Sequence, residues 1–185
     1  MEFEELLLPA ALLLLAVAAA AIILHSTRIY REHERGVRFR LGKLNKVLGP
    51  GIAFTLPYID SAITVDMRSR VLEMDELKAM AKEGAVVFLD VVVRYHISSP
   101  ELAVTAVANV EASLRTLAET AVRNSVGELS FGQLVGKKEF INARLRESVS
   151  NEAGKWGLKV EGVEIMDITP SERTMQQINK KSGKR

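Results

Sequence analysis

Few residues in this chain could carry out chemistry, and their spacing forms no recognisable catalytic or metal-binding motif. There is no cysteine, which excludes thiolate catalysis, disulfides and cysteine-based zinc sites. The three histidines, His25, His33 and His96, do not form the i, i+4 pair of a helical metal site. The signature motifs of serine hydrolases, zinc peptidases and dinucleotide-binding enzymes are also missing. We therefore predict that the protein is not an enzyme and holds no metal or cofactor.

The N-terminal part of the sequence contains a long apolar run. Residues 6–24 carry no charged side chain and are mostly Leu and Ala. As a helix they would span roughly 28 Å, close to the ~30 Å hydrocarbon core of a bilayer. A membrane anchor, a cleaved signal peptide and a buried helix are the three interpretations. The acidic residues before the run disfavour a signal peptide, and the length of the run at the N-terminus disfavours a buried helix.

We therefore predict a transmembrane anchor within residues 1–28, preceded by a short acidic N-terminus. Its apolar side chains include Leu6, Leu8, Leu12, Leu13, Leu15, Val17, Ile22, Ile23 and Leu24.

Basic residues follow this run but do not precede it. They are Arg28, Arg31, Arg35, Arg38, Arg40, Lys43 and Lys46. Because Lys and Arg near the ends of a span set its orientation, we predict a single-pass membrane protein with its main domain on the cytoplasmic face. The net charge of the whole chain is only +2, which does not indicate a nucleic-acid partner.

The rest of the chain changes from a period of two to a helical period and back. The predicted strands cover residues 36–42, 52–56, 62–71, 85–97 and 158–168, with a turn or loop at 75–84. One predicted helix begins at the N-cap Ser99 and ends at Gly127, and a further helical stretch runs from Ser130 to Gly157. Separate runs of strands and helices indicate an α+β fold, in which antiparallel strands pack with two or three helices.

Several apolar stripes predict the core of this fold. The strand at 85–97 has one unbroken apolar face and one mixed face with Asp90, Arg94 and His96. An Asp90–Arg94 ion pair on that mixed face is a surface pair in our interpretation, and His96 is a packing or surface residue. The side chains predicted to lie inward are Val87, Leu89, Val91, Val93, Tyr95 and Ile97 on the strand, Val110, Leu114, Leu117 and Ala121 on the first helix, and Phe140, Ile141, Leu145, Val149 and Trp156 on the second.

Residues 49–60 combine prolines and aromatic residues with little charge. Two interpretations compete for this stretch, namely a core strand with its turns and a loop pressed into the headgroup layer of a membrane. The alternation favours the core for Phe54 and Leu56. Pro57 and Tyr58 fit both interpretations.

Three blocks of the sequence resemble one known family. The first contains F-R-L-G at 39–42, G-P-G at 49–51, L-P at 56–57 and V-D-M-R at 65–68. The second has R-N-x-x-G at 123–127, and the third has W-G-x-x-V at 156–160 with V-E-I at 163–165. Together, in this order, they resemble the stomatin/prohibitin/flotillin (SPFH, band 7) domain, above all its stomatin (slipin) branch. The resemblance assigns residues 29–170 to that domain and residues 171–185 to a short basic tail.

The resemblance implies a membrane-tethered scaffold that self-assembles, organises membrane microdomains and controls integral membrane proteins. It also implies that residues 50–58 lie near the bilayer. We therefore predict an interface with the lipid headgroups made by Arg28, Tyr30, Arg31, Pro50, Phe54, Leu56, Pro57 and Tyr58. The predicted partners are the bilayer, further copies of the chain, and an integral membrane protease or channel.

Two features differ from the family pattern. Family members usually continue into a long coiled coil, whereas this sequence stops at Arg185, so that either the gene is short or the sequence is cut. Without that coil, the expectation is a lower-order assembly rather than a ring or cage built through it. The usual T-K-D-G-like turn is replaced by Ala81–Gly84, which keeps the turn residues without the Thr. The alternatives to a scaffold are a dedicated regulatory subunit of one membrane protease or channel, and a membrane-anchored hydrolase.

Overall fold

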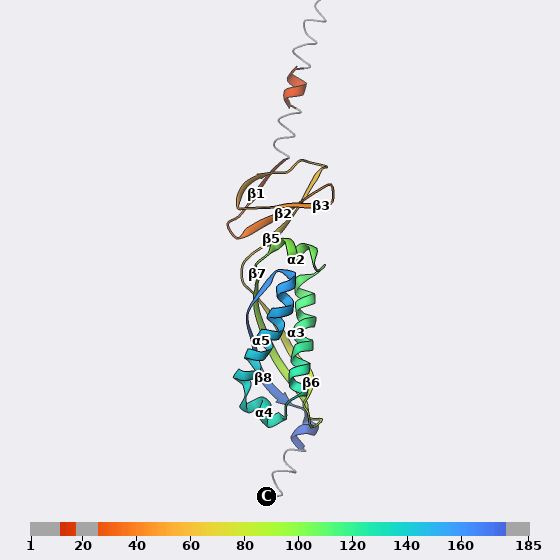
Figure 1. Ribbon diagram of the computed structural model, residues 1–185, viewed down its shortest axis with the longest axis vertical. Coiled ribbons are helices and arrows are strands. Elements are labelled where there is room, and N and C mark those ends of the chain that lie inside the picture. Colours follow the sequence, from red (N-terminus) through yellow and green to blue (C-terminus); the bar gives the residue numbers. More distant parts are fainter. Residues whose placement is uncertain (1–11, 18–25, 177–185) are drawn as a thin grey trace, which may run out of the picture. The chain divides into compact units, whose positions relative to one another are not determined.

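The computed structural model describes residues 12–17 and 26–176, and the chain divides into two compact units (Figure 1). The strand unit extends to Asp66, and the helix–sheet unit begins at Met67. Both contain antiparallel strands, and the second also contains several helices. The predicted α+β class is confirmed.

The strand unit contains two small antiparallel sheets. Strand β1 (Thr27–Tyr30) pairs with β4 (Gly51–Phe54) in a two-stranded ribbon. Strand β2 (Glu34–Arg40) lies between β3 (Lys43–Leu48) and β5 (Asp60–Asp66) in the other sheet. The predicted strands at 36–42 and 52–56 correspond to β2 and β4.

A close contact joins the two sheets of the strand unit. The ring of Tyr30, at the end of β1, is buried and lies directly above Gly36 of β2. A Cβ atom at position 36 would overlap that ring, so only glycine leaves the ring enough room. This contact positions the β1–β4 ribbon on β2.

The helix–sheet unit is built on a three-stranded antiparallel sheet. Strand β7 (Val86–Ile97) lies in its centre, between β6 (Arg70–Met80) and β8 (Leu158–Pro170). The predicted apolar face of β7 is confirmed, because every second side chain from Val87 to Ile97 is buried. Arg94 pairs with Glu164 of β8, and Asp90 accepts a hydrogen bond from the backbone of Glu76, so the Asp90–Arg94 pair does not form.

Helices cover the apolar face of this sheet (Figure 1). Helix α2 (Pro100–Thr105) is followed by α3 (Val110–Gly127), α4 (Phe131–Gly136), α5 (Lys138–Ala153) and a 3₁₀ turn, η1 (Gly154–Trp156). Helix α3 packs on β6 and α5 packs on β8. The predicted capping box of Ser130 and Gln133 is confirmed at the start of α4, and Gly157 ends η1 in the left-handed conformation.

Several predicted details of the core are wrong. Residues 75–80 belong to β6 rather than to a loop, because a bulge at Asp75–Glu76 interrupts the alternation but not the strand. Residues 106–109 divide the first predicted helix into α2 and α3. Phe140 is 65% exposed, since it lies about 100° around α5 from the buried row of Ile141, Leu145 and Val149. The buried row of α3 includes Leu114 and Ala121, but Val110 and Leu117 are only half-buried.

The predicted anchor falls mostly outside the described residues, which do not include Leu6, Leu8, Ile22, Ile23 or Leu24. Leu12, Leu13, Leu15 and Val17 are described, and they are helical and exposed. Over residues 12–17 and 26–176, none of the helices combines the length and the apolar character needed to cross a membrane.

Candidate functional site

The two-stranded ribbon of the strand unit exposes an apolar face. Ile29 of β1 is paired directly with Ile52 of β4, and Thr27 is paired with Phe54. Directly paired residues point to the same side of a ribbon, so these side chains share one face, opposite that of Tyr30. Ile29, Ile52 and Phe54 are 74%, 69% and 63% exposed. An exposed apolar face of this kind marks an interaction surface rather than a core.

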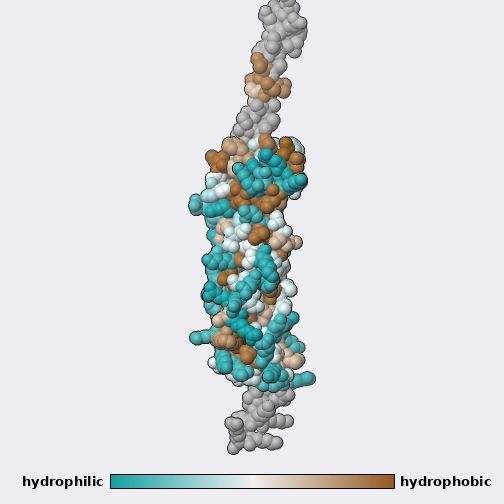
Figure 2. Space-filling view, in the orientation of Figure 1, coloured by the Kyte–Doolittle hydropathy of each residue, from teal (hydrophilic) through white to brown (hydrophobic). Residues whose placement is uncertain are grey.

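The loop from β4 to β5 adds to this surface. Leu56, Tyr58 and Ile59 are all exposed, and Tyr58 has a positive φ of 67°. The backbone N–H groups of Ile59 and Asp60 donate to the carbonyl oxygen of Leu56, which closes a tight turn. This turn holds the Tyr58 side chain in solvent. Figure 2 shows hydrophobic side chains gathered over the strand unit, next to a hydrophilic cluster.

We call Ile29, Ile52, Phe54, Leu56, Tyr58 and Ile59 the apolar surface of the strand unit.

A basic face lies on the β3–β2–β5 sheet. Arg38 is paired directly with Lys46, and Arg40 with Lys43, so four cations project from the same side of β2 and β3. Asp60 of β5 lies opposite Arg40. We call Arg38, Arg40, Lys43, Lys46 and Asp60 the basic face of the strand unit.

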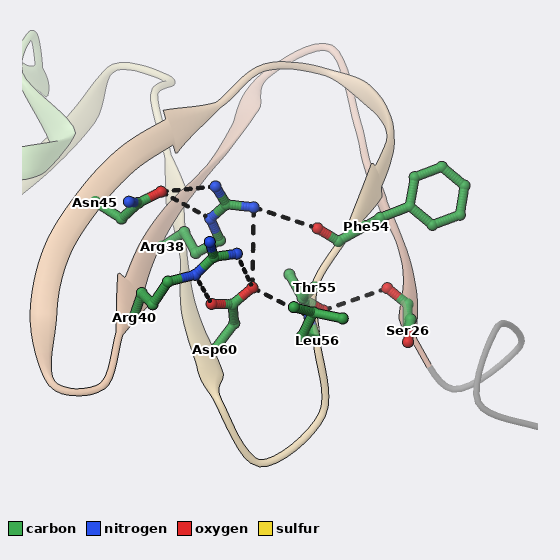
Figure 3. Close-up of polar contacts among 8 residues, drawn as sticks. All are labelled: Ser26, Arg38, Arg40, Asn45, Phe54, Thr55, Leu56 and Asp60. Atoms are coloured by element: carbon green, nitrogen blue, oxygen red, sulfur yellow. Dashed lines mark hydrogen bonds and ion pairs between the residues drawn. The ribbon is translucent and has the colours of Figure 1, made fainter.

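Asp60 is the acidic centre of that face (Figure 3). Its Oδ1 and Oδ2 atoms accept hydrogen bonds of 2.8 and 3.1 Å from Arg40, and Oδ2 also accepts one of 3.1 Å from the backbone of Leu56. Arg38 Nη1 is 3.9 Å from Oδ2. The hydrogen bonds from Arg40 are the main reason why the pKa of Asp60 falls from its ordinary value of 3.8 to about 2. The same pair raises the pKa of Arg40, so both groups stay ionised at neutral pH.

The predicted interface residues lie on the strand unit, with one clear exception. Arg28, Arg31, Pro50, Phe54, Leu56 and Tyr58 are exposed, and Pro57 is half-buried. The preference of the alternation for a core position at Phe54 and Leu56 is wrong. Tyr30 is 4% exposed, and a ring buried against Gly36 cannot reach a headgroup, so the structure does not place it on a surface.

Ile29, Ile52 and Ile59 are also exposed on the strand unit, although the sequence did not indicate them as interface residues. β1 has only four residues, so no alternation was available to show which way Ile29 points.

A second polar cluster lies on the helix–sheet unit. Glu161 accepts a hydrogen bond of 2.7 Å from Ser69 and lies 2.7 Å from Nδ1 of His96. The Ser69 hydrogen bond is the main cause, and the His96 contact the second, of a lowered pKa at Glu161. Because Ser69 bonds to the carboxylate and not to the imidazole, the histidine is not placed to activate the serine as a nucleophile. Among the described residues, no group of three or more His, Asp or Glu side chains could hold a metal ion.

Comparison with known proteins identifies the family. The family model described as SPFH domain / Band 7 family matches residues 28–185. The chain belongs to this family. The resemblance seen in the three sequence blocks is therefore confirmed, including the likeness to stomatins. Proteins of the family are in general membrane-associated scaffolds rather than enzymes, and this is the general role that membership indicates.

Similar proteins come from archaea and from animals. The chain is 35% identical to an uncharacterised protein of Methanocaldococcus jannaschii, over 82% of this chain and 76% of that protein. It is 34% identical to stomatin of Mus musculus, over 76% of this chain and 50% of stomatin. It is 31% identical to a stomatin homologue of Pyrococcus horikoshii, over 77% and 54% of the two chains. The aligned region thus covers only about half of the two stomatin relatives.

Proposed function

We propose that this protein is a membrane-anchored oligomeric scaffold that organises membrane microdomains and modulates integral membrane proteins. The observation that carries the proposal is the apolar surface of the strand unit, which lies on the same unit as the basic face. Apolar and aromatic side chains enter the interfacial layer, while nearby Lys and Arg side chains contribute ~1 kcal/mol each near an anionic surface.

In this proposal the run at residues 6–24 is the transmembrane anchor. Strand β1 begins at Thr27, directly after that run, so an inserted anchor would keep the strand unit near the bilayer. Arg28 and Arg31 follow immediately and, by the positive-inside rule, keep the two units on the cytoplasmic face.

Contact between the apolar surface and the bilayer can be measured with a single fluorophore. The chain has no cysteine, so Ile52→Cys and, as a matched control, Val71→Cys each provide one labelling position. Both positions are exposed on strands, at 69% and 57%. In full-length protein reconstituted into nanodiscs, a polarity-sensitive dye at position 52 should shift to the blue and be quenched by quencher-bearing lipids. The dye at position 71 should keep the emission expected in water and should not be quenched by these lipids. A water-like signal at both positions would contradict the proposed interface.

Deletion of residues 1–27 tests the anchor. The truncated chain should leave the membrane fraction after a high-salt wash, because the remaining interfacial contacts are weaker than a transmembrane helix. Retention after that wash would show that the run is not the main tether.

The proposed topology requires a separate test. A tag at residue 185 should be shielded from protease added to intact cells, and its digestion from outside would contradict the cytoplasmic assignment.

The assembly state separates the scaffold from the alternative of a dedicated regulatory subunit. Cross-linking of the full chain in its native membrane, followed by mass spectrometry, should give mainly links between copies of the chain. A stoichiometric complex with one integral protease or channel would favour the regulatory subunit instead.

A further inference from the structure

The strand unit contains a pocket that is lined by basic and apolar residues. It has a volume of about 460 Å³ and lies beside the turn that joins β3 to β4. Arg38 and Lys46 provide the charge, and Pro50, Ile52 and Phe54 are among the apolar residues that line it. We call this cavity the Arg38–Lys46 pocket.

The two cations of this pocket face each other directly. Arg38 and Lys46 are cross-strand partners in the β2–β3 pair, and two like charges in this position repel each other. Arg40 and Lys43 repeat the arrangement two pairs further along the strands. Asp60 is the acidic side chain next to these cations, and Arg40 binds both of its oxygen atoms, while the paired Glu34 and Asp66 lie at the opposite end of β2 and β5. The face therefore has an excess of positive charge that an external anion would neutralise.

Arg38 is held in place before any ligand arrives. Its Nε and Nη2 atoms donate to Asn45 Oδ1 at 3.2 and 2.6 Å, and Nη1 donates to the carbonyl oxygen of Phe54 at 3.4 Å (Figure 3). Only 12% of the side chain is exposed. Lys46, by contrast, is exposed and forms no salt bridge with any acidic residue in the described part of the chain. The pocket thus combines one fixed guanidinium with one ammonium that is available to an anion.

The apolar rim decides what kind of anion fits. Ile52 and Phe54 line the pocket and also belong to the apolar surface proposed to contact the bilayer. The ring of Phe54 points away from the polar cluster, while its carbonyl oxygen holds Arg38 (Figure 3). The pocket therefore adjoins the apolar surface. A free inorganic anion would gain nothing from that neighbouring surface, whereas an anionic phospholipid places its phosphate next to apolar glycerol and acyl groups.

We propose that the Arg38–Lys46 pocket binds the phosphate of an anionic phospholipid in the bilayer to which the protein is anchored. This inference rests on the proposed membrane-facing role of the strand unit. It adds to that role a preference for anionic over zwitterionic lipid, located at one pocket.

Photo-cross-linking in nanodiscs tests the proposal on the full-length protein. Phosphatidylcholine nanodiscs carry a trace of either a phosphatidylglycerol or a phosphatidylcholine probe with a photoreactive group near the headgroup. After digestion with a protease that does not cut at lysine, mass spectrometry measures labelling of residues 46–54. The phosphatidylglycerol probe should label these residues more strongly than the phosphatidylcholine probe.

Lys46→Gln should reduce labelling by the phosphatidylglycerol probe about fivefold, the contribution of one basic residue near an anionic surface. Lys46→Arg should preserve the labelling. Lys78→Gln is the matched control, because Lys78 is also an exposed lysine on a strand but lies on β6, and it should leave the labelling unchanged. Equal labelling by the two probes, or no effect of Lys46→Gln, would overturn the proposal.

Inorganic phosphate distinguishes the lipid from a soluble source of the same group. Added phosphate and added chloride, at matched ionic strength, should reduce labelling by the phosphatidylglycerol probe to the same extent, because both ions act only by screening charge. Selective loss with phosphate would show that the pocket takes a soluble anion, and would overturn the lipid assignment. If the dye at position 52 gave the emission expected in water, the proposed function itself would be contradicted. If that dye gave the emission expected in a bilayer but Lys46→Gln had no effect on labelling, only the proposed lipid binding by the pocket would be contradicted.

Discussion

The strand unit and the helix–sheet unit both contain antiparallel strands, but they place their apolar side chains differently. In the described part of the strand unit, the buried apolar side chains are Tyr30, Val37, Leu48 and Val65. The helix–sheet unit buries apolar side chains along all three strands and along its helices. Conversely, the strand unit exposes several large apolar residues on β1, β4 and the following loop.

This difference separates two uses of apolar residues. In the helix–sheet unit, burial of their apolar surface stabilises the fold by roughly 25 cal/mol per Å² of surface buried. In the strand unit many of them stay in water and contribute nothing to that term. We infer that the helix–sheet unit supplies most of the folding free energy and that the strand unit supplies the contact surface. The four predictions below test this division, from the largest expected effect to the smallest.

Leu145→Ala should reduce the free energy of unfolding of the helix–sheet unit by about 2–5 kcal/mol, because it leaves a cavity at a fully buried position of α5. Fluorescence of Trp156, the only tryptophan of the chain, reports unfolding of this unit in urea. Val135→Ala is the control, since Val135 is 57% exposed on α4 and its loss should cost less than about 0.5 kcal/mol. Equal effects of the two substitutions would show that α5 is not central to the core.

Gly36→Ala should destabilise the strand unit by about 1–3 kcal/mol, because the added methyl group overlaps the buried ring of Tyr30. Faster amide hydrogen exchange in residues 26–66, with unchanged exchange in the helix–sheet unit, would show the effect. Gly49→Ala is the matched control, because a Cβ atom at position 49 meets no atom within 4 Å. A neutral Gly36→Ala variant would mean that the ribbon is not positioned by Tyr30.

Acid should destabilise the strand unit through Asp60. The folded-state pKa of Asp60 lies below its ordinary value, so its stabilising contribution is complete above 3.8 and is lost as the pH falls towards about 2. Protonation removes the partner of Arg40 and leaves the cations of the basic face to repel each other. The protection of residues 26–66 against hydrogen exchange, relative to an unstructured chain at the same pH, should therefore fall over this pH interval.

Asp60→Asn is the control for this effect. The variant should be less protected than the parent at neutral pH, and the additional loss of protection between pH 3.8 and about 2 should be absent. If the variant kept the full acid response, other carboxylates would account for it.

Phe54→Ser should change the free energy of unfolding by less than about 0.5 kcal/mol, because Phe54 is 63% exposed and contributes little to the core. Phe140→Ser is the matched control, with 65% exposure on the helix–sheet unit. In nanodiscs only Phe54→Ser should weaken the quenching, by lipid-borne quenchers, of the dye at position 52. A large loss of stability in Phe54→Ser alone would show that Phe54 has a structural role.

The regular elements of the helix–sheet unit could be predicted because local pattern and tertiary packing agree there. Twelve-residue β7 alternates over its whole length, and the buried row of α5 has helical spacing. Short or irregular elements could not be predicted in the same way. β3 reads Lys-Leu-Asn-Lys-Val-Leu, and its bulge opposite Arg38 and Phe39 removes the alternation.

The candidate site was only partly predictable for a related reason. The residue types alone identify the cluster of basic residues and the apolar, proline-containing stretch at residues 50–58. Alternation cannot show, however, which face of a short ribbon is covered. Phe54 and Leu56 alternate like core residues, yet the other face of the ribbon, with Tyr30, turns toward Gly36 and β2.

The sequence by itself determined the α+β class, the central strand β7, the buried row of Ile141, Leu145 and Val149 on α5, and the family. These depend on periodicity and on motifs whose residues are close in the chain. Only the tertiary structure decided that Ile29, Ile52 and Phe54 share an exposed face and that Arg38 and Lys46 face each other in a pocket. Both arrangements depend on the register of strands that pair across turns. Register is set by the pairing of distant backbone groups and by bulges, which local composition does not specify.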